Sequence, residues 1–263
     1  MIARRKWAAA LALGAVVAAS ACRRAGPPPA IPADMAACVP SGAVLLAGAK
    51  LDTLRASPLY PRLPASALAF LKPWENASTL LVAFNGAEIL LIEQGSFREA
   101  ASGATLAAPN LMLAGSPALI QAGLAQRRSG SPGSPDLFAR ASSVATGHAA
   151  WIATRGNVNL PLTGDAENLN RLLRLARFAT LGLRIQQPVT LDFTAQCATA
   201  DNARHLEETL RAILSLSSAG LARRPELAAL LRAVDLQRQQ DSVHASLAAS
   251  DETMPQILEL FAR

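Results

Sequence analysis

Hydrophobic residues recur along the chain in short runs that predict strands and at wider helical spacing that predicts helices. Asn85-Gly86 lies between two apolar runs and predicts a tight hairpin, because both central residues of a type I′ turn need positive φ. The first half thus contains a strand, a broken helix, a hairpin, a strand and a helix. These elements cover residues 43–47, 51–71, 79–93, 110–114 and 117–126.

The second half shows a similar order of elements. A strand is followed by a helix capped by Asp165, a hairpin, a helix capped by Asp201, a helix from Pro225, a hairpin and a final helix. The strand, the two hairpins and the final helix cover residues 149–154, 181–195, 234–249 and 255–261. In the hairpin at 181–195, apolar residues alternate with polar ones, so one face of this sheet is expected to meet water.

These patterns predict an α+β fold built from duplicated strand-helix-hairpin-helix modules, with mainly antiparallel sheets and helices packed on one face. The predicted first module spans residues 37–126 and the second spans 143–263. Between them, the segment 127–142 contains RRSGSPGSPD and predicts a flexible linker. The layout is similar to that of uncharacterised exported bacterial proteins with paired α+β repeats, a resemblance that transfers no functional residue.

The chain begins with a basic cluster at Arg4-Arg5-Lys6 and an apolar run that ends in Ala19-Ser20-Ala21. This is the pattern of an export signal over residues 1–21. The run from Trp7 is shorter than the roughly 20 residues that a membrane-spanning helix needs. Because Cys22 follows the small residues, the segment resembles the lipobox of bacterial lipoprotein precursors, which implies that Cys22 is acylated and becomes the first residue.

Two outcomes of processing remain open at this point. Ala19-Ser20-Ala21 also fits ordinary signal peptidase, which would give plain secretion without acylation. If the lipoprotein resemblance holds, the absence of Asp after Cys22 implies the outer membrane rather than the inner one. The proline-rich segment 22–36 predicts an extended tether or a leftover without a role.

Charge and composition argue against a nucleic-acid partner. The signal holds three of the 25 basic residues, so the remaining 22 stand against 19 acidic ones. Aromatic residues make up 4% of the chain and are scattered, whereas single-strand binding needs clustered basic and stacking groups.

The prediction for the two remaining cysteines depends on how the export signal is processed. If Cys22 is acylated, Cys38 and Cys197 remain as an even pair in an oxidising compartment. A disulfide between them is our prediction. The alternative is two buried free thiols, which behave as small apolar residues.

No sequence motif names a reaction, a metal site or a cofactor. His205-Leu206-Glu207 matches the H-x-E fragment of zinc deaminases, but the accompanying P-C-x-x-C is absent. His148 and His244 lie in other predicted elements. We therefore expect no cofactor and no metal ligand.

Two surface features are candidates for binding. One is a stripe of arginines at Arg171, Arg174 and Arg177, which would meet anionic surfaces or else form an ordinary solvated helix face. The other is the polar face of the second-half sheet, which would bind a glycan or protein or else be plain wet surface. Its candidate residues are Arg184, Asp192, Gln196 and His244.

The sequence thus favours a non-enzymatic envelope lipoprotein that is held on the membrane by acyl chains and binds an envelope protein or glycan. An accessory subunit of a larger assembly is a related possibility. The alternative from another class is an envelope hydrolase with a non-standard site between the two halves, for which His148, His205 and Asp192 are the available groups.

Overall fold

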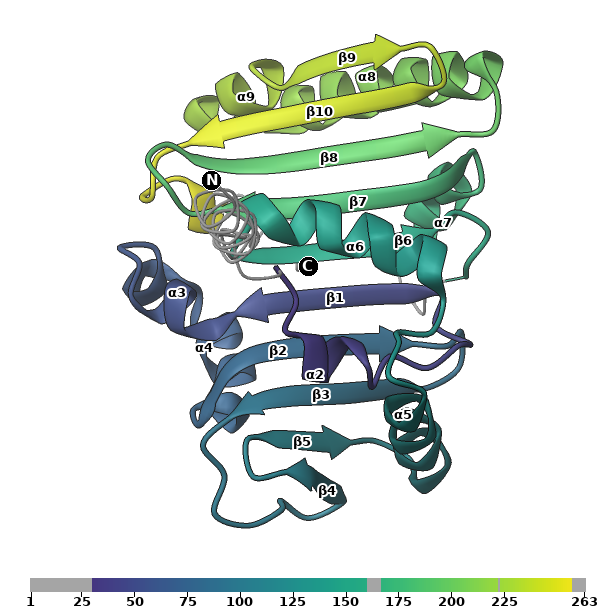
Figure 1. The fold of residues 1–263 in the computed structure, drawn as a ribbon. Coiled ribbons are helices and arrows are strands. Elements are labelled where there is room, and N and C mark those ends of the chain that lie inside the picture. Colours follow the sequence, from purple (N-terminus) through teal and green to yellow (C-terminus); the bar gives the residue numbers. More distant parts are fainter. Residues whose placement is uncertain (1–29, 160–166, 222, 257–263) are drawn as a thin grey trace, which may run out of the picture.

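The computed structural model describes residues 30–159, 167–221 and 223–256 (Figure 1). The elements of the first half are α2 (Ala33–Ala36), β1 (Leu45–Lys50), α3 (Leu51–Arg55), η1 (Tyr60–Arg62), α4 (Ala65–Leu71), η2 (Lys72–Trp74), β2 (Ala77–Phe84), β3 (Ile89–Gly95), β4 (Ala104–Ala108), β5 (Leu111–Ala114) and α5 (Pro117–Ser129). Those of the second half are α6 (Pro135–Gly147), β6 (Ala150–Arg155), α7 (Glu167–Leu173), β7 (Ala176–Arg184), β8 (Val189–Cys197), α8 (Ala200–Gly220), α9 (Pro225–Arg232), β9 (Asp235–Gln239) and β10 (Ser242–Ala249).

The ten strands in the described part of the chain form one antiparallel sheet in the order β4-β5-β3-β2-β1-β6-β7-β8-β10-β9. The central pair is β1 and β6. The two halves of the chain are therefore joined by backbone hydrogen bonds within one continuous sheet. Counted outward from this pair, each half has the same strand order. The predicted α+β class with antiparallel pairing is confirmed.

The hairpin between β2 and β3 forms where the sequence predicts it, but the predicted type I′ turn is wrong. Residues 85–88 form a four-residue loop between the strands, and Asn85 does not have positive φ. Gly86 has φ of 101°, which only glycine adopts without strain. The Asn85 side chain accepts hydrogen bonds from the backbone N–H groups of Ala87 and Glu88, at 2.9 and 2.8 Å. Local turn chemistry therefore sets the register of these strands, in which Phe84 faces Ile89.

One side of the sheet carries α2, α5 and α6, and we call it the α6 face (Figure 1). Its core is apolar and continuous across the first half and the centre. The buried strand residues that these helices cover include Leu46, Leu81, Ile92, Leu113 and Trp151. This burial of aliphatic side chains is the main source of stability there.

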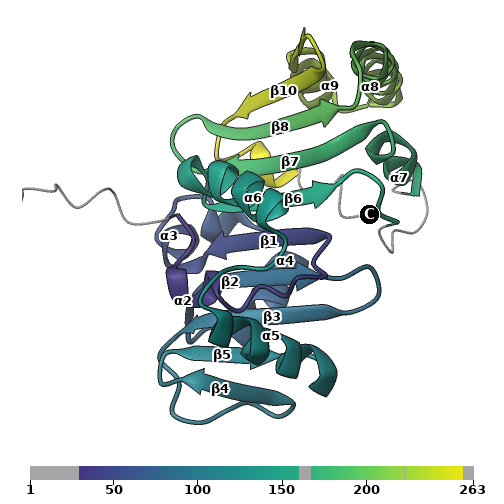
Figure 2. The same ribbon diagram turned by 45° about the vertical axis from the view of Figure 1, so that its right-hand side comes forward.

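The opposite side, which we call the α8 face, carries α8 and α9 over the second half (Figure 2). Leu206 from α8 packs with Val243 of β10, and Leu227 from α9 packs with Leu247. The segment from α3 to η2 covers the same side in the first half, with Leu51 against Leu80. Helices thus lie on both faces, which corrects the prediction of one helical face.

The predicted flexible linker 127–142 is wrong. Helix α5 continues to Ser129 and α6 begins at Pro135, so only a short connection remains. Ser134 is buried, and its hydroxyl donates to the carbonyl oxygens of Ser41 and Ala43, at 2.6 and 2.8 Å. The predicted tether 22–36 also ends early, because Ile31 and two residues of α2, Met35 and Ala36, pack into the core.

The predicted disulfide is absent, and both cysteines are free and buried. Cys38 belongs to the core of the α6 face, whereas Cys197 belongs to the core under α8. Burial raises the pKa of the Cys38 thiol to about 11 and also raises the pKa of Cys197. Both therefore act as small apolar core residues, the alternative reading.

The arginine stripe does not lie on one helix. Helix α7 ends at Leu173, so Arg174 follows it and Arg177 belongs to strand β7. The chain leaves the helical pattern because Ala176 pairs with Cys197 at the start of the β7–β8 ladder. Asp165, the predicted cap, lies outside the described residues, as does most of the predicted helix 255–261, of which residues 255 and 256 are described and are helical together with Met254.

Candidate functional site

The α6 face changes character over the outer strands of the second half. Residues directly opposite one another in an antiparallel sheet point to the same side, so the register identifies a row that runs through Gly182, Asp192, Ser246 and Asp235. The neighbouring rows are also polar. They contain Thr180, Arg184, Thr190, Thr194, Gln196, Ser242, His244, Gln237 and Gln239. We call this surface the polar sheet face.

The helices that pack against β8, β9 and β10 do so from the other side. Both α8 and α9 contribute to cores on the α8 face. Among the described residues, α6 alone packs as a helix on the α6 face of β7. Polar side chains on this side of β8, β10 and β9 are half-buried or exposed, so they are available to a partner.

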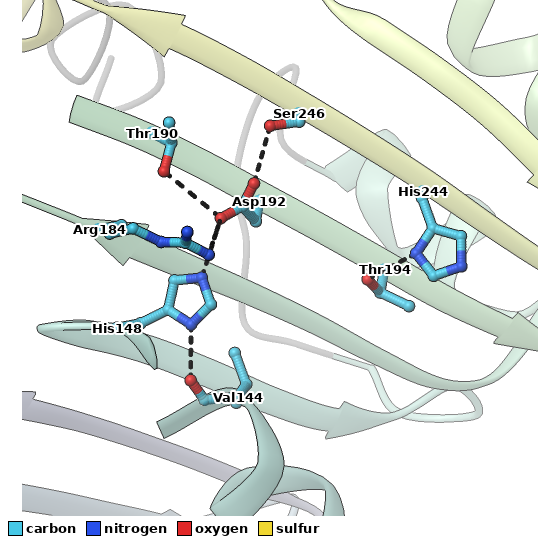
Figure 3. A network of polar contacts seen from close by, with 8 residues as sticks. All are labelled: Val144, His148, Arg184, Thr190, Asp192, Thr194, His244 and Ser246. Carbon is cyan, nitrogen blue, oxygen red and sulfur yellow. Dashed lines mark hydrogen bonds and ion pairs between the residues drawn. The ribbon is translucent and has the colours of Figure 1, made fainter. Parts of the chain in front are cut away.

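Asp192 is the centre of a hydrogen-bond network on the polar sheet face (Figure 3). Four side chains donate to its two oxygens: His148 Nε2 at 3.0 Å, Arg184 Nη2 at 3.3 Å and Thr190 Oγ1 at 3.5 Å to Oδ2, and Ser246 Oγ at 2.8 Å to Oδ1. The donors come from β7, β8, β10 and the end of α6. The network therefore joins four elements around one carboxylate.

His148 contacts acceptors with both ring nitrogens. Its Nδ1 lies 2.6 Å from the carbonyl oxygen of Val144, and its Nε2 faces Asp192. A carbonyl oxygen and a carboxylate oxygen only accept hydrogen bonds, so both ring nitrogens of His148 are engaged with acceptors.

The imidazole reaches this position because β7 carries glycine beneath it. A Cβ at Gly182 would lie 2.4 Å from His148 Cδ2, well inside contact distance. The side chain of His148 is 11% exposed, against 30% for Asp192 and 45% for Arg184. The network thus runs from a nearly enclosed imidazole to an open guanidinium.

The network holds Asp192 in its ionised form. Burial alone would raise the pKa of this carboxyl, but hydrogen bonds from His148 and Ser246, with the charges of Arg184 and His148, outweigh burial and lower it. The charge of the Asp192 carboxylate is therefore compensated by the groups that contact it.

The structure assigns different places to the residues predicted from the sequence. Arg184 and Asp192 are in direct contact, and Gln196 and His244 lie on the same face, where His244 Nδ1 is 3.1 Å from Thr194 Oγ1. Alternation predicted this shared face correctly. Ser246, which the prediction omitted, also contacts Asp192 through the β8–β10 register.

The groups named for a hydrolase are only partly together. His148 contacts Asp192, but His205 lies exposed on α8, which packs on the other face. Ser246 donates to Asp192 and not to the imidazole. A nucleophile–base pair needs a free imidazole lone pair beside the hydroxyl, and both nitrogens of His148 are already engaged. This geometry does not favour the hydrolase.

The described residues, 30–159, 167–221 and 223–256, form neither a metal-ligand cluster nor a membrane-spanning helix. No group of three or more His, Cys, Asp or Glu side chains there could hold a metal ion. Likewise, none of the helices formed by these residues is long and apolar enough to cross a membrane.

Fold and network together define an α+β protein with one antiparallel sheet and a charge-compensated polar face. No protein-family model and no curated protein matches the chain. Among solved structures, crystal form III of TP0453 is similar, with a TM-score of 0.50 and 12% identity, over 86% of this chain and 97% of TP0453. Crystal form I gives 0.48 and 14%, over 90% and 99%. At such identity the likeness concerns the fold alone.

Proposed function

We propose that this protein is an exported lipoprotein, acylated at Cys22, that binds an envelope protein or glycan through the polar sheet face. The observation that carries the binding role is the Asp192 network. Several elements converge on one carboxylate at a surface that no core requires, since α8 and α9 bury the opposite face. Ordered polar groups on a rigid sheet are suited to recognition, because their side chains lose little entropy on binding.

The anchoring role is supported by the sequence around Cys22. The basic start, the short apolar run and the small residues before the cysteine match the pattern of a cleaved and acylated precursor. Each buried methylene contributes about 0.8 kcal/mol, so two or more acyl chains give stable attachment. The outer membrane is the proposed destination, because Arg23 rather than Asp follows Cys22.

The anchor is tested by detergent-phase partitioning with mass spectrometry of the N-terminus. We expect the wild type to partition into detergent with an acylated Cys22, and Cys22→Ser to remain in the aqueous phase. An unmodified Cys22 at the mature N-terminus would refute the lipoprotein proposal and leave plain export.

The binding surface is tested by crosslinking in isolated membranes with matched variants. Thr194→Arg places a bulky cation in the middle of the polar sheet face, and Ser217→Arg places the same group on exposed α8. We expect a specific crosslinked species that Thr194→Arg removes and Ser217→Arg retains. A species retained by both variants, or none in the wild type, would contradict the proposed surface.

A further inference from the structure

A hollow of about 390 Å³ lies at the end of the sheet where β2 begins and β3 ends, away from the Asp192 network. Its volume is in the range of sites for small molecules. Seven of the residues around it carry polar side chains and the other two are small. They are Asp52, Glu75, Asn76, Ala77, Ser78, Gln94, Gly95, Ser96 and Asn110.

Backbone contacts make the floor of this hollow rigid. The N–H groups of Gly95 and Ser96 donate to the carbonyl oxygens of Asn110 and Asn76, both at 3.1 Å. The strands approach so closely that a Cβ at Gly95 would lie 2.1 Å from Asn76 O. The register of β2 and β3 also shifts between Ala77 and Thr79. The hollow thus results from an irregularity in strand pairing that backbone hydrogen bonds hold in place, and not from the conformation of a loop.

Arg55 holds the backbone and the Asp52 side chain on one side of the hollow in place. Its guanidinium donates to the carbonyl oxygens of Ala77 and Trp74, at 2.8 and 2.6 Å, and to Asp52 Oδ1 at 3.1 Å. The charge of Asp52 is therefore compensated. Glu75 remains as the lining carboxylate without such a partner among the described residues.

Some of the side chains that line the hollow keep their hydrogen-bonding capacity, whereas Ser78 donates to the carbonyl oxygen of Gln94 and the Gln94 amide donates to Asp34. Within the described part of the chain, the amides of Asn76 and Asn110 and the hydroxyl of Ser96 make no side-chain hydrogen bond. Each amide offers a donor and an acceptor at one end, which matches a pair of neighbouring hydroxyls. Glu75 adds an acceptor, as ionised carboxylates accept strongly from hydroxyl groups.

We propose that this hollow is a second binding site, which takes a sugar unit through its hydroxyl groups. Uncompensated Glu75 disfavours anions, and the polar lining disfavours apolar ligands. A divalent cation would need more carboxylate oxygens than are gathered here. An organic ammonium would favour an aromatic lining, which the hollow lacks. This site is independent of the polar sheet face, since the two lie in different halves of the sheet.

The test is ligand-observed NMR on the full chain with glucose, N-acetylglucosamine, putrescine and inorganic phosphate as separate probes. We expect millimolar binding of at least one sugar, typical of a few hydrogen bonds at an open site. Asn76→Ala and Asn110→Ala should each weaken it about fivefold, the loss of roughly one hydrogen bond. Asn157→Ala, an equally exposed asparagine after β6, is the matched control.

Three results would overturn the proposal. One is that neither sugar binds up to tens of millimolar while the circular dichroism of the protein shows it folded. Another is sugar binding that Asn76→Ala and Asn110→Ala leave unchanged. The third is preferential binding of putrescine or phosphate, which would make the hollow a charge site. None of these results bears on the polar sheet face, so the two proposals fail separately.

Discussion

The two halves of the sheet have the same strand order outward from β1 and β6, yet they place opposite chemistry on the α6 face. The third strand from the centre is β3 in the first half and β8 in the second. On the same row of side chains, β3 carries Ile92 and β8 carries Asp192. Ile92 is buried under helices, while Asp192 is partly open to solvent. The comparison teaches that strand order does not decide which side of a sheet becomes core. The alternation of side chains within each strand does.

Truncating one side chain on the α6 face in each half should separate the two halves most clearly. Ile92→Ala removes a fully buried side chain from the core of the α6 face, and we expect it to lower the free energy of unfolding by about 2–5 kcal/mol. Gln237→Ala on the polar sheet face should change it by less than about 0.5 kcal/mol. Urea denaturation measures both, and similar losses would mean that the polar sheet face is covered.

The glycine under His148 gives a second, smaller contrast. Gly182→Ala drives a methyl group into the imidazole, so we expect a loss of about 1–3 kcal/mol from overpacking. Gly42→Ala, where nothing lies within 4 Å, is the matched control and should be close to neutral. If thermal unfolding shows equal effects, the close approach of His148 to β7 is wrong.

How well the sequence predicts each element depends on whether its cause is local. The hairpin at Asn85-Gly86 and the polar alternation that places Arg184 and Asp192 together are local, and both were predicted. Helix α6 was not, because its start looks like a linker. It begins there because Ser134 is held by the carbonyl oxygens of Ser41 and Ala43, far away in sequence.

The same reasoning explains the errors in the candidate site. His148 reaches Asp192 from a helix end 44 positions away, and only the β6–β7 and β7–β8 registers bring them together. The disulfide prediction counted cysteines without knowing that Cys38 and Cys197 belong to different cores. Periodicity alone also extended a helix past Leu173, where strand pairing takes over.

Acid titration tests the charge compensation that distinguishes the polar sheet face. Because the pKa of Asp192 is lowered in the folded state, its stabilisation is present above the unfolded value near 3.8 and is lost as pH falls through the folded value. Asp192→Asn should cost about 1–2 kcal/mol at pH 7, discounted for partial exposure, and should flatten the acid limb of stability. Asp201→Asn on exposed α8 is the control. An acid limb unchanged in Asp192→Asn would contradict the network.

The smallest effect should come from the first half, where the Glu93 carboxyl is buried and has no cationic partner among the described residues. Burial raises the pKa of Glu93 even though Trp74 donates a hydrogen bond to it, so its ionised form is disfavoured in the folded state. Stability is therefore fully present below the unfolded pKa near 4.5 and falls as pH rises through the folded value. Glu93→Gln keeps an acceptor for Trp74 and removes the charge, so it should be slightly more stable than wild type at pH 7 and lose that advantage near pH 4. The exposed Glu208→Gln variant should show no such crossover. If the stability of Glu93→Gln relative to wild type is lower at pH 7 than at pH 4, the expected contrast between the carboxylates of the two halves is wrong.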